Sequence, residues 1–333
     1  MAVYGYAHTL NDMRKMQNAD GSFDRVLEVL AQSNPVINDI PWAEGDLPIG
    51  NKTTVRASLP TPSIRRINRG VPATKGTTKQ IIDVCMNLED LSEVDVELLA
   101  GKANPQVYRA SEDEAHLEGM SNYVASTLFY GNRTTDPDSF DGLAARYNTL
   151  TGDRGTVGYQ TIPGGTANAE GKNTSMYIVD WGDRRVTGIY PRGTQAGFQK
   201  EDMGEYWSYD KSGNKFRVVG TKFNWKSGLA VEDVRSVVRV CNIDATKLAS
   251  MTDSAQRTLM DKIIFAKNRI FAPKSPIIYV SDDMYSYLET YLMNKNNVHV
   301  TREDRMGAAP LLRLSGIPVK KCDCILETEA AVE

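Results

Sequence analysis

The sequence predicts an α+β fold, in which helices and strands occupy separate stretches of one chain. Two stretches carry the 3.6-residue periodicity of amphipathic helices, and turn-forming residues divide the long region between them into short alternating segments. Nearer the N-terminus, a run of alternating β-branched and polar residues is typical of paired strands. The chain has 333 residues, more than one hydrophobic core usually supports, so we expect two subdomains.

The composition is that of an ordinary globular protein. Hydrophobic residues make up 41% and charged residues 24%, and the formal net charge is −3, which argues against disorder and against wholesale nucleic-acid binding. The N-terminus lacks a basic start followed by an apolar run, and no stretch approaches the roughly 20 apolar residues that cross a bilayer. We therefore expect neither secretion nor a membrane partner.

Residues 1–50 predict an N-terminal arm rather than a domain. A short apolar periodicity favours a small helix capped by Asp20 or Ser22, after which the chain becomes extended. The apolar residues of this helix are Phe23, Val26, Leu27 and Leu30. Because so few apolar side chains cannot form a core, the arm needs a surface to lie on, such as a neighbouring subunit.

Residues 51–82 alternate β-branched and polar side chains, which predicts a long two-stranded ribbon. Four turn-forming residues interrupt the run, namely Pro60, Pro62, Gly70 and Gly76. A lone ribbon is marginally stable in water, so it too is expected to dock elsewhere.

Residues 105–130 predict one long helix. Asn104 can cap it, Pro105 suits its first position and Gly131 can end it. Its apolar stripe is formed by Leu117, Met120, Val124 and Leu128. Ser111 and Glu114 have the spacing of a capping box, so a break near Ser111 is the alternative. The unbroken helix would be about 40 Å long at about 1.5 Å per residue.

The region from 133 to 244 predicts short strands between turns, among them 175–180 and 185–190. An amphipathic helix follows at about 253–271. Its apolar face comprises Leu259, Ile263, Ala266 and Ile270, widened by Met260, Ile264 and Phe271.

The remaining residues predict a strand-helix-strand unit and two closing strands. The unit consists of a buried strand at 276–280, a helix from a Ser281 cap to about Met293, and a strand at 298–300. The closing strands are expected at 311–314 and 319–326.

No residue pattern typical of an enzyme active site, a cofactor site or a metal centre is found. The three histidines, His8, His116 and His299, lack metal-ligand spacing, and there is no glycine-rich phosphate loop. A series of aspartates before Gly142 hints at a calcium loop, but its spacing is wrong and Pro137 interrupts it. We expect no catalytic residues, no cofactor and no metal.

Other reactive side chains also have ordinary interpretations. The four cysteines, Cys85, Cys241, Cys322 and Cys324, predict reduced thiols rather than a disulfide framework. Adjacent acids such as Glu112 and Asp113 are expected to lie on solvated faces, because neighbouring residues on a helix diverge.

The distribution of charge is unusual. Residues 47–82 contain seven basic residues and no acidic one, a net charge of +7. Residues 83–118 contain ten acidic residues and only Lys102 and Arg109 as basic ones, a net charge of −8. Opposite charges on one chain suit a head-to-tail contact between identical subunits, which repetition extends into rings or shells.

This pattern predicts subunit-interface residues of both signs. The basic ones are Arg56, Arg65, Arg66 and Arg69, and the acidic ones are Glu93, Asp95, Glu97, Glu112, Asp113 and Glu114. Two alternatives are that the ribbon folds back on its own acidic segment or stays solvated. Phosphate binding is a third, disfavoured because the ribbon has no aromatic residue for stacking.

Several segments together resemble the major capsid proteins of tailed bacteriophages with the Hong Kong 97 fold. They are INDIPWAEGDLPIGNKTTVRASLP (37–60), SEDEAHLEGMSNYVASTLFYGN (111–132), FDGLAARYNTL (140–150), GLAVEDVRSVVRVCNID (228–244) and GIPVKKCDCILETE (316–329). The resemblance covers most of the chain and implies a Hong Kong 97-like capsid fold. It implies an N-terminal arm at 1–50, an extended E-loop at 51–82, a peripheral domain with a long spine helix at 83–134, an axial domain at 135–305, and returning peripheral strands with the C-terminus at 306–333.

The resemblance also implies a function and partners. The protein is expected to be a structural major capsid protein, not an enzyme, that assembles through hexamers and pentamers into the icosahedral shell around the phage genome. It would reside in the virion, and in the host cytoplasm during assembly. Expected partners are a portal protein, packaged double-stranded DNA bound without sequence specificity and, at the subunit junctions, a cement or decoration protein. The long N-terminal extension of self-scaffolding members is missing, which implies a separate scaffolding protein.

Two points stay open. Some members of the family cross-link their subunits through Lys and Asn with a nearby Glu, but only the lysines Lys52, Lys75 and Lys79 can be matched here, so noncovalent shells are expected. The alternatives for function are an encapsulin-like compartment shell that loads enzyme cargo and, less favoured, an enzyme of mixed α and β fold.

Overall fold

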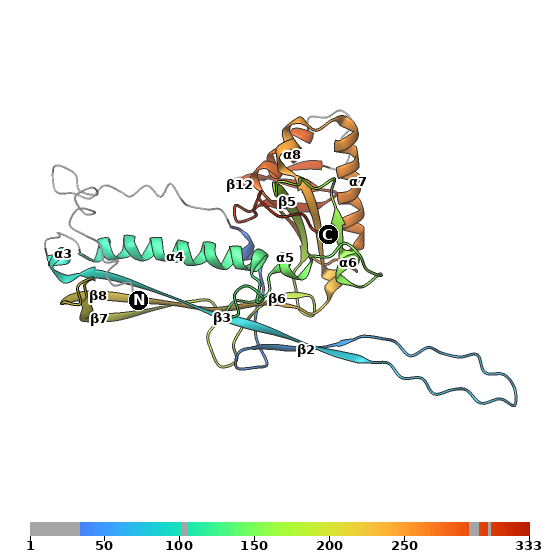
Figure 1. Ribbon diagram of the computed structural model, residues 1–333, viewed down its shortest axis with the longest axis horizontal. Coiled ribbons are helices and arrows are strands. Elements are labelled where there is room, and N and C mark those ends of the chain that lie inside the picture. Colours follow the sequence, from blue (N-terminus) through green and yellow to red (C-terminus); the bar gives the residue numbers. More distant parts are fainter. Residues whose placement is uncertain (1–33, 101–104, 293–299, 306–307) are drawn as a thin grey trace. The chain divides into compact units, whose positions relative to one another are not determined.

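A computed structural model describes residues 34–100, 105–292, 300–305 and 308–333 (Figure 1). The helix expected near Phe23 and the cap expected at Asn104 lie outside these residues. The described chain divides into two compact units. The smaller unit contains residues 87–125 and 197–226, and the larger unit contains 34–86, 126–196 and 227–333.

The smaller unit combines helices with a long hairpin. Its elements are the end of β3 (Thr78–Asp95), α3 (Val96–Ala100), most of α4 (Pro105–Tyr130), β7 (Phe198–Tyr209) and most of β8 (Lys215–Val231). β7 and β8 pair antiparallel around a turn in which Asp210 accepts hydrogen bonds from the backbone N–H groups of Ser212 and Asn214. Val94, Leu99 and Tyr108 form its small buried cluster, against which Val219 packs.

The prediction of one unbroken helix at 105–130 is confirmed by α4. Of the predicted apolar stripe, Met120, Val124 and Leu128 are buried, whereas Leu117 is 40% exposed. The ring of His116 on this helix stacks against Phe223 of β8. The helix therefore covers one face of the hairpin with aromatic as well as aliphatic contacts.

The prediction of a two-stranded ribbon at 51–82 is only partly right. β2 (Gly50–Arg56) and β3 pair antiparallel, from Gly50 with Val84 to Arg56 with Thr78, but residues 57–77 form no strand. Pro60, Pro62 and Pro72 lie in this stretch, and proline cannot donate to a ladder. The ribbon is thus short and continues into a long exposed loop (Figure 1).

A seven-stranded sheet with two helices on one face forms most of the larger unit (Figure 1). The strand order is β11 (Val300–Arg305), β12 (Ala308–Leu314), β13 (Ile317–Lys321), β10 (Pro276–Val280), β5 (Asn173–Asp180), β9 (Val237–Asp244) and β4 (Thr161–Pro163). The helices are α7 (Asp253–Arg269) and α8 (Asp282–Leu292). Their buried faces join the sheet in one continuous hydrophobic core.

Several sequence predictions match this sheet. The strands expected at 175–180 and 276–280 are β5 and β10, and the Ser281 hydroxyl accepts from the N–H of Met284 at the start of α8. The strand expected at 319–326 ends at Lys321, because the chain then turns and the N–H of Cys324 donates to the Asn34 side chain. α7 ends before Phe271, which was expected on its apolar face but is 57% exposed.

Residues 34–50 lie on the larger unit, so this part of the predicted arm has its own chain as a surface. It contains α2 (Val36–Asp39) and β1 (Trp42–Glu44), and β1 pairs with β6 (Val186–Tyr190). Val36 and Ile40 are buried. The Asp39 carboxylate accepts from the hydroxyl of Tyr279 at 2.8 Å and pairs with Lys320.

Short helices complete the larger unit. They are α5 (Leu143–Arg146), α6 (Val157–Gln160), and the 3-10 helices η1 (Val234–Ser236) and η2 (Ala245–Ser250). Within the described residues, no helix is both long and apolar enough to cross a membrane.

Candidate assembly surface

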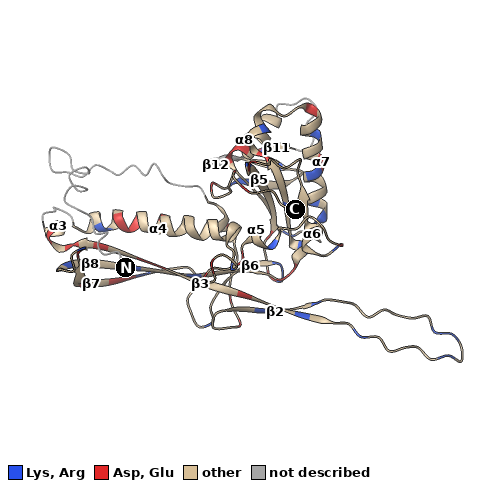
Figure 2. Cartoon of the chain, viewed as in Figure 1, with Lys and Arg blue, Asp and Glu red and all other residues tan. Residues whose placement is uncertain are grey.

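Arg65, Arg66 and Arg69 are in the middle of the loop at 57–77, and all three are exposed. Figure 2 shows Lys and Arg in blue near the far end of this loop. The N–H of Arg69 donates to the carbonyl of Arg66 at 3.1 Å, and Asn68 adopts a φ of 64°. The three arginines therefore lie within or beside one tight backbone turn, as their close spacing in the sequence suggests.

The same loop exposes apolar side chains. Ile64 and Ile67 are 95% and 91% exposed, and Leu59 is 74% exposed. Large apolar side chains that are almost fully exposed beside charged ones are a feature of interaction sites. The loop therefore combines cationic and apolar groups that its own chain leaves uncovered.

The acidic residues predicted for the interface all lie in the smaller unit, but several already have partners there. Lys200 pairs with Asp113 at 2.6 Å. The Glu93 carboxylate accepts from the hydroxyls of Tyr206 at 2.7 Å and Ser208 at 2.9 Å. Asp95 accepts from the N–H of Glu97 at the start of α3. These carboxylates stabilise their own unit as well as contributing negative charge.

The expectation that Glu112 and Asp113 are solvated is wrong, since each is only 9% exposed. The reason is the β7–β8 hairpin, whose Lys200 reaches α4. Glu97 and Glu114, by contrast, are exposed. They are the predicted acidic interface residues that present their charge most fully to solvent.

Further ion pairs link the elements of the smaller unit. Arg109 of α4 pairs with Asp202 of β7 at 3.0 Å, and this guanidinium holds the pKa of the Asp202 carboxyl below its usual value. Lys222 of β8 lies 3.3 Å from Glu89 of β3. Hydrogen bonding from Asn87, followed by the contact with Lys222, lowers the pKa of Glu89. Much of the acidic segment is therefore balanced internally.

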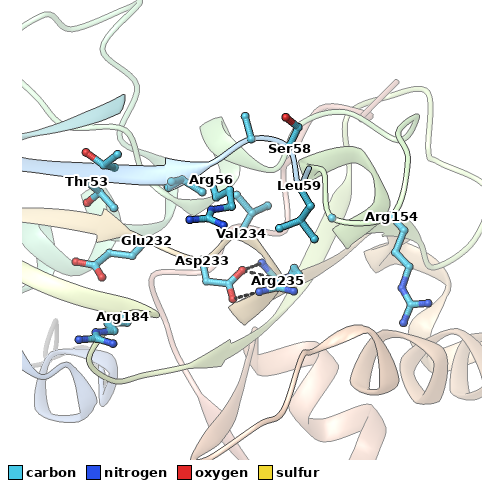
Figure 3. Close-up of a pocket in the computed structure, with 14 residues that line it drawn as sticks. Thr53, Arg56, Ser58, Leu59, Arg154, Arg184, Glu232, Asp233, Val234 and Arg235 are labelled. Atoms are coloured by element: carbon cyan, nitrogen blue, oxygen red, sulfur yellow. Dashed lines mark hydrogen bonds and ion pairs between the residues drawn. The ribbon is translucent and has the colours of Figure 1, made fainter. Parts of the chain in front are cut away.

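Arg56 lies apart from the loop tip, in a groove of about 830 Å³ in the larger unit (Figure 3). One wall is a continuous stretch of β2 and the residues after it, 53–59. The opposite wall is formed by 232–235, and Arg154 and Arg184 also line the groove. Charge counting along the sequence missed Arg154 and Arg184, because they lie in turns that are far from β2 in the sequence, although they line the same groove.

One acid of the groove is neutralised by a neighbour. Arg235 donates to both oxygens of Asp233 at 2.9 Å and stacks on the ring of Phe271. Although burial opposes it, the Arg235 guanidinium lowers the pKa of Asp233. Burial, together with the nearby carboxylates of Asp183, Asp83 and Asp46, raises the pKa of Glu232. With Asp233 paired to Arg235, the groove keeps the exposed guanidinium groups of Arg56, Arg154 and Arg184 against the single carboxyl of Glu232, so the basic side chains outnumber the acidic ones.

The potentially reactive groups have structural surroundings. All four cysteines are free thiols. The imidazole of His116 lies 2.6 Å from Asp90 in the smaller unit. No cluster of three metal-binding side chains occurs within residues 34–100, 105–292, 300–305 and 308–333.

Comparison with known proteins gives one family and several related folds. The sequence model of the family described as major capsid protein GP7 matches residues 18–333. No curated protein matches the chain. A chain from the near-atomic cryo-EM structure of bacteriophage Epsilon15 is 27% identical, with a TM-score of 0.77 over 100% of this chain and 99% of that one.

Two more distant structures are also similar. A chain of the bacteriophage JBD30 capsid is 10% identical, with a TM-score of 0.51 over 95% of this chain and 99% of that one, which shows likeness of fold alone. A chain of the SrpI encapsulin complex from Synechococcus elongatus PCC 7942 is 12% identical, with a TM-score of 0.43 over 72% of this chain and 96% of that one. The encapsulin likeness is too weak to support an argument.

Proposed function

Because this chain belongs to the family of major capsid protein GP7 and forms the icosahedral shell of a tailed bacteriophage, we propose that its exposed loop and outward-facing carboxylates make contacts between neighbouring copies. The predicted α+β fold of the Hong Kong 97-like type is confirmed, as is the predicted role as a virion shell protein. Assembly through hexamers and pentamers fits that role.

The observation that carries the proposal is the exposure of Ile64 and Ile67 beside three arginines at the tip of the loop. Isoleucine side chains at more than 90% exposure gain free energy when a second surface covers them, about 25 cal/mol per Å² of apolar area removed from water. Arginine beside an apolar contact adds selectivity for an acidic surface. Glu97 and Glu114 supply exposed acids on the same chain.

The division into parts is also proposed by analogy with the family. Residues 51–82 would be the E-loop, α4 the spine helix of a peripheral domain at 83–134, 135–305 the axial domain, and 306–333 the returning strands. The length of α4 and the exposure of 57–77 support this assignment. Residues 1–50 would be the N-terminal arm, although 34–50 pack on the larger unit.

Partners beyond the chain itself are further proposals. Family membership supports a separate scaffolding protein, a portal protein, a cement or decoration protein, and packaged double-stranded DNA held without sequence specificity. It also supports assembly in the host cytoplasm and the absence of catalysis, cofactors and bound metal.

Electron microscopy of the purified recombinant protein tests the function. Closed shells of uniform size would support it, and shells that need a co-expressed scaffolding protein would support that partner as well. A small discrete oligomer under both conditions would contradict the proposal. Shells that retain a host enzyme as cargo would instead favour the compartment alternative.

A further inference from the structure

The groove beside Arg56 follows the free edge of an outer strand. β2 ends the strand order of its sheet, with β3 on one side and no described strand on the other. The N–H of Cys85 donates to the carbonyl of Ile49, and the N–H of Ala57 to that of Thr77, which shows that odd-numbered residues of β2 bond to β3. Since antiparallel bonding alternates, the backbone groups of Lys52, Thr54 and Arg56 point to the free edge.

One end of this edge is already closed. Gly50 also points outward, and it exchanges two backbone hydrogen bonds with Leu47. The unpaired stretch therefore begins at Lys52 and runs along the wall of the groove (Figure 3). Unpaired edge groups are a template for an incoming strand, which adds by main-chain hydrogen bonds.

The size of the groove matches a strand. Five residues of β-strand measure about 17 Å by 4.8 Å by 10 Å, or about 800 Å³. The groove holds about 830 Å³. Its three exposed arginines, Arg56, Arg154 and Arg184, select for an acidic occupant.

β7 on the same chain has the complementary properties. It pairs with β8 on one side, and the N–H of Asp210 bonds to Asn214, so odd-numbered residues near its end have outward-pointing backbone groups. These residues are Glu205, Trp207 and Tyr209, and the last two side chains are 60% and 44% exposed. Tryptophan and tyrosine are the residues most enriched at energetic centres of interfaces.

The charge of β7 also fits. It carries Glu201, Asp202 and Glu205 against a single lysine, Lys200. Within their own unit Asp202 pairs with Arg109, Glu205 with Arg217 and Lys200 with Asp113, so Glu201 is the acid of β7 that is left to meet another subunit. Glu201 is exposed and forms no ion pair with any residue that the structure describes. There are three other outer strands among the described residues: β1 and β4 have only three residues each, and the sequence of β11, VTREDR, has as many basic as acidic residues. β7 is therefore the better match in length, charge and apolar content.

We propose that the groove receives the β7 edge of a second copy, which extends the sheet beyond β2 from one subunit into the next. This inference rests on the proposed shell function and names one contact within it. The arginines of the groove face Glu201 of β7, while Trp207 and Tyr209 cover the apolar side chains of Val55, Leu59 and Val234.

Hydrogen–deuterium exchange tests the pairing, with shells of the unaltered protein as the assembled sample. Exchange is compared between assembled shells and unassembled subunits, the latter being the Arg65→Glu, Arg66→Glu variant. The amides of 52, 54 and 56 and those of 205, 207 and 209 should exchange at least about tenfold more slowly in shells, because added-strand bonds open rarely. Unchanged exchange in either segment would overturn the proposal, whether or not the shell forms.

Empty and DNA-filled shells separate the possible occupants. Protection in both kinds of shell supports the second copy, whereas protection of 52–56 only in filled shells identifies nucleic acid and overturns the pairing. A second variant, Trp207→Ser with Glu201→Lys, changes exposed positions only and should lower the shell yield about tenfold. The control variant Lys172→Glu, also a charge reversal at an exposed position, should give a normal shell yield. Normal yield from that variant counts against β7 as the occupant.

Discussion

Arg239 donates to Glu329 across 2.8 Å, and both side chains are about 95% buried in the larger unit. Glu329 also accepts hydrogen bonds from the hydroxyls of Ser175 and Tyr130. The guanidinium of Arg239 additionally donates to the backbone carbonyls of Ala144 and Tyr147. One buried carboxylate thus ties the C-terminal segment to β5, β9 and the last residue of α4.

Glu329→Gln should destabilise the larger unit strongly, because it leaves the Arg239 guanidinium buried without a counter-charge. Breaking a buried pair from one side costs about 3–5 kcal/mol. The midpoint of urea unfolding, measured on the unassembled Arg65→Glu, Arg66→Glu variant, should fall accordingly. Glu333→Gln, at an exposed position, is the control and should leave the midpoint unchanged. Equal midpoints for the two variants would contradict the assigned role of the pair.

Charge reversal at the loop tip, Arg65→Glu with Arg66→Glu, should leave the subunit folded and block shell formation. A single exposed ion pair contributes only about 0–1 kcal/mol, but the loss recurs at every equivalent contact in the shell. Circular dichroism checks the fold and microscopy checks assembly. The matched variant Arg65→Lys with Arg66→Lys keeps the charge and should assemble. Shells of normal yield from the reversed variant would remove the loop from the interface.

Gly220→Ala should destabilise the smaller unit. A Cβ at this position would lie 2.4 Å from the ring of Tyr206, which crosses the glycine to reach Glu93. Overpacking of this kind costs about 1–3 kcal/mol. Thermal unfolding should show a lower midpoint. In the double variant Gly220→Ala with Tyr206→Ala, the fall in the midpoint should be smaller than the sum of the falls in the two single variants. Simple additivity would show that the ring and the glycine are not coupled.

Glu232→Gln should raise the thermal midpoint at pH 7. Burial and the nearby acids raise the pKa of Glu232 in the folded state, so its contribution to stability is present at low pH and lost as pH rises through that folded pKa. The difference between variant and parent should vanish below about pH 3, where the carboxyl is protonated in both states. A midpoint that falls at pH 7 would show that Glu232 makes a favourable contact as a carboxylate.

Shells should be held noncovalently. Lys75 and Lys79 are exposed, whereas amide formation needs a desolvated amine beside a carboxylate that can accept its proton. Boiled and reduced particles should therefore give one band near 36.9 kDa on a denaturing gel. A ladder of multiples would reveal cross-linking through another lysine.

Helices were the most predictable elements of this chain. α4 and α7 bury residues at helical spacing, so periodicity located both within two residues of their ends. β7 escaped detection as a strand, because it carries Lys200 and Asp202, which pair with Asp113 and Arg109 of α4, where a half-buried strand would have apolar residues. A strand stabilised by ion pairs lacks the alternation of apolar residues by which strands are recognised.

The candidate surface was predictable only where it is local in sequence. The clustering of Arg65, Arg66 and Arg69 follows directly from their spacing. The groove did not, since Arg154 and Arg184 reach it from separate turns and no spacing rule relates them to Arg56. Likewise, the internal pairing of Asp113 with Lys200 depends on a contact between distant segments, so counting charges overstated the acidity that faces solvent.

The subunit contacts that we propose for the loop at 57–77 have a consequence for the fidelity of assembly. Its side chains contact little of their own subunit, so docking must first offset the conformational entropy of the residues it orders, about 1–2 kcal/mol for each backbone unit fixed. Each loop contact is therefore weak when only a few copies have met, and a misplaced subunit can dissociate before its neighbours enclose it. Once many copies surround it, the same contacts act together. The exposed loop thereby allows errors to be corrected early and makes the closed shell difficult to dismantle.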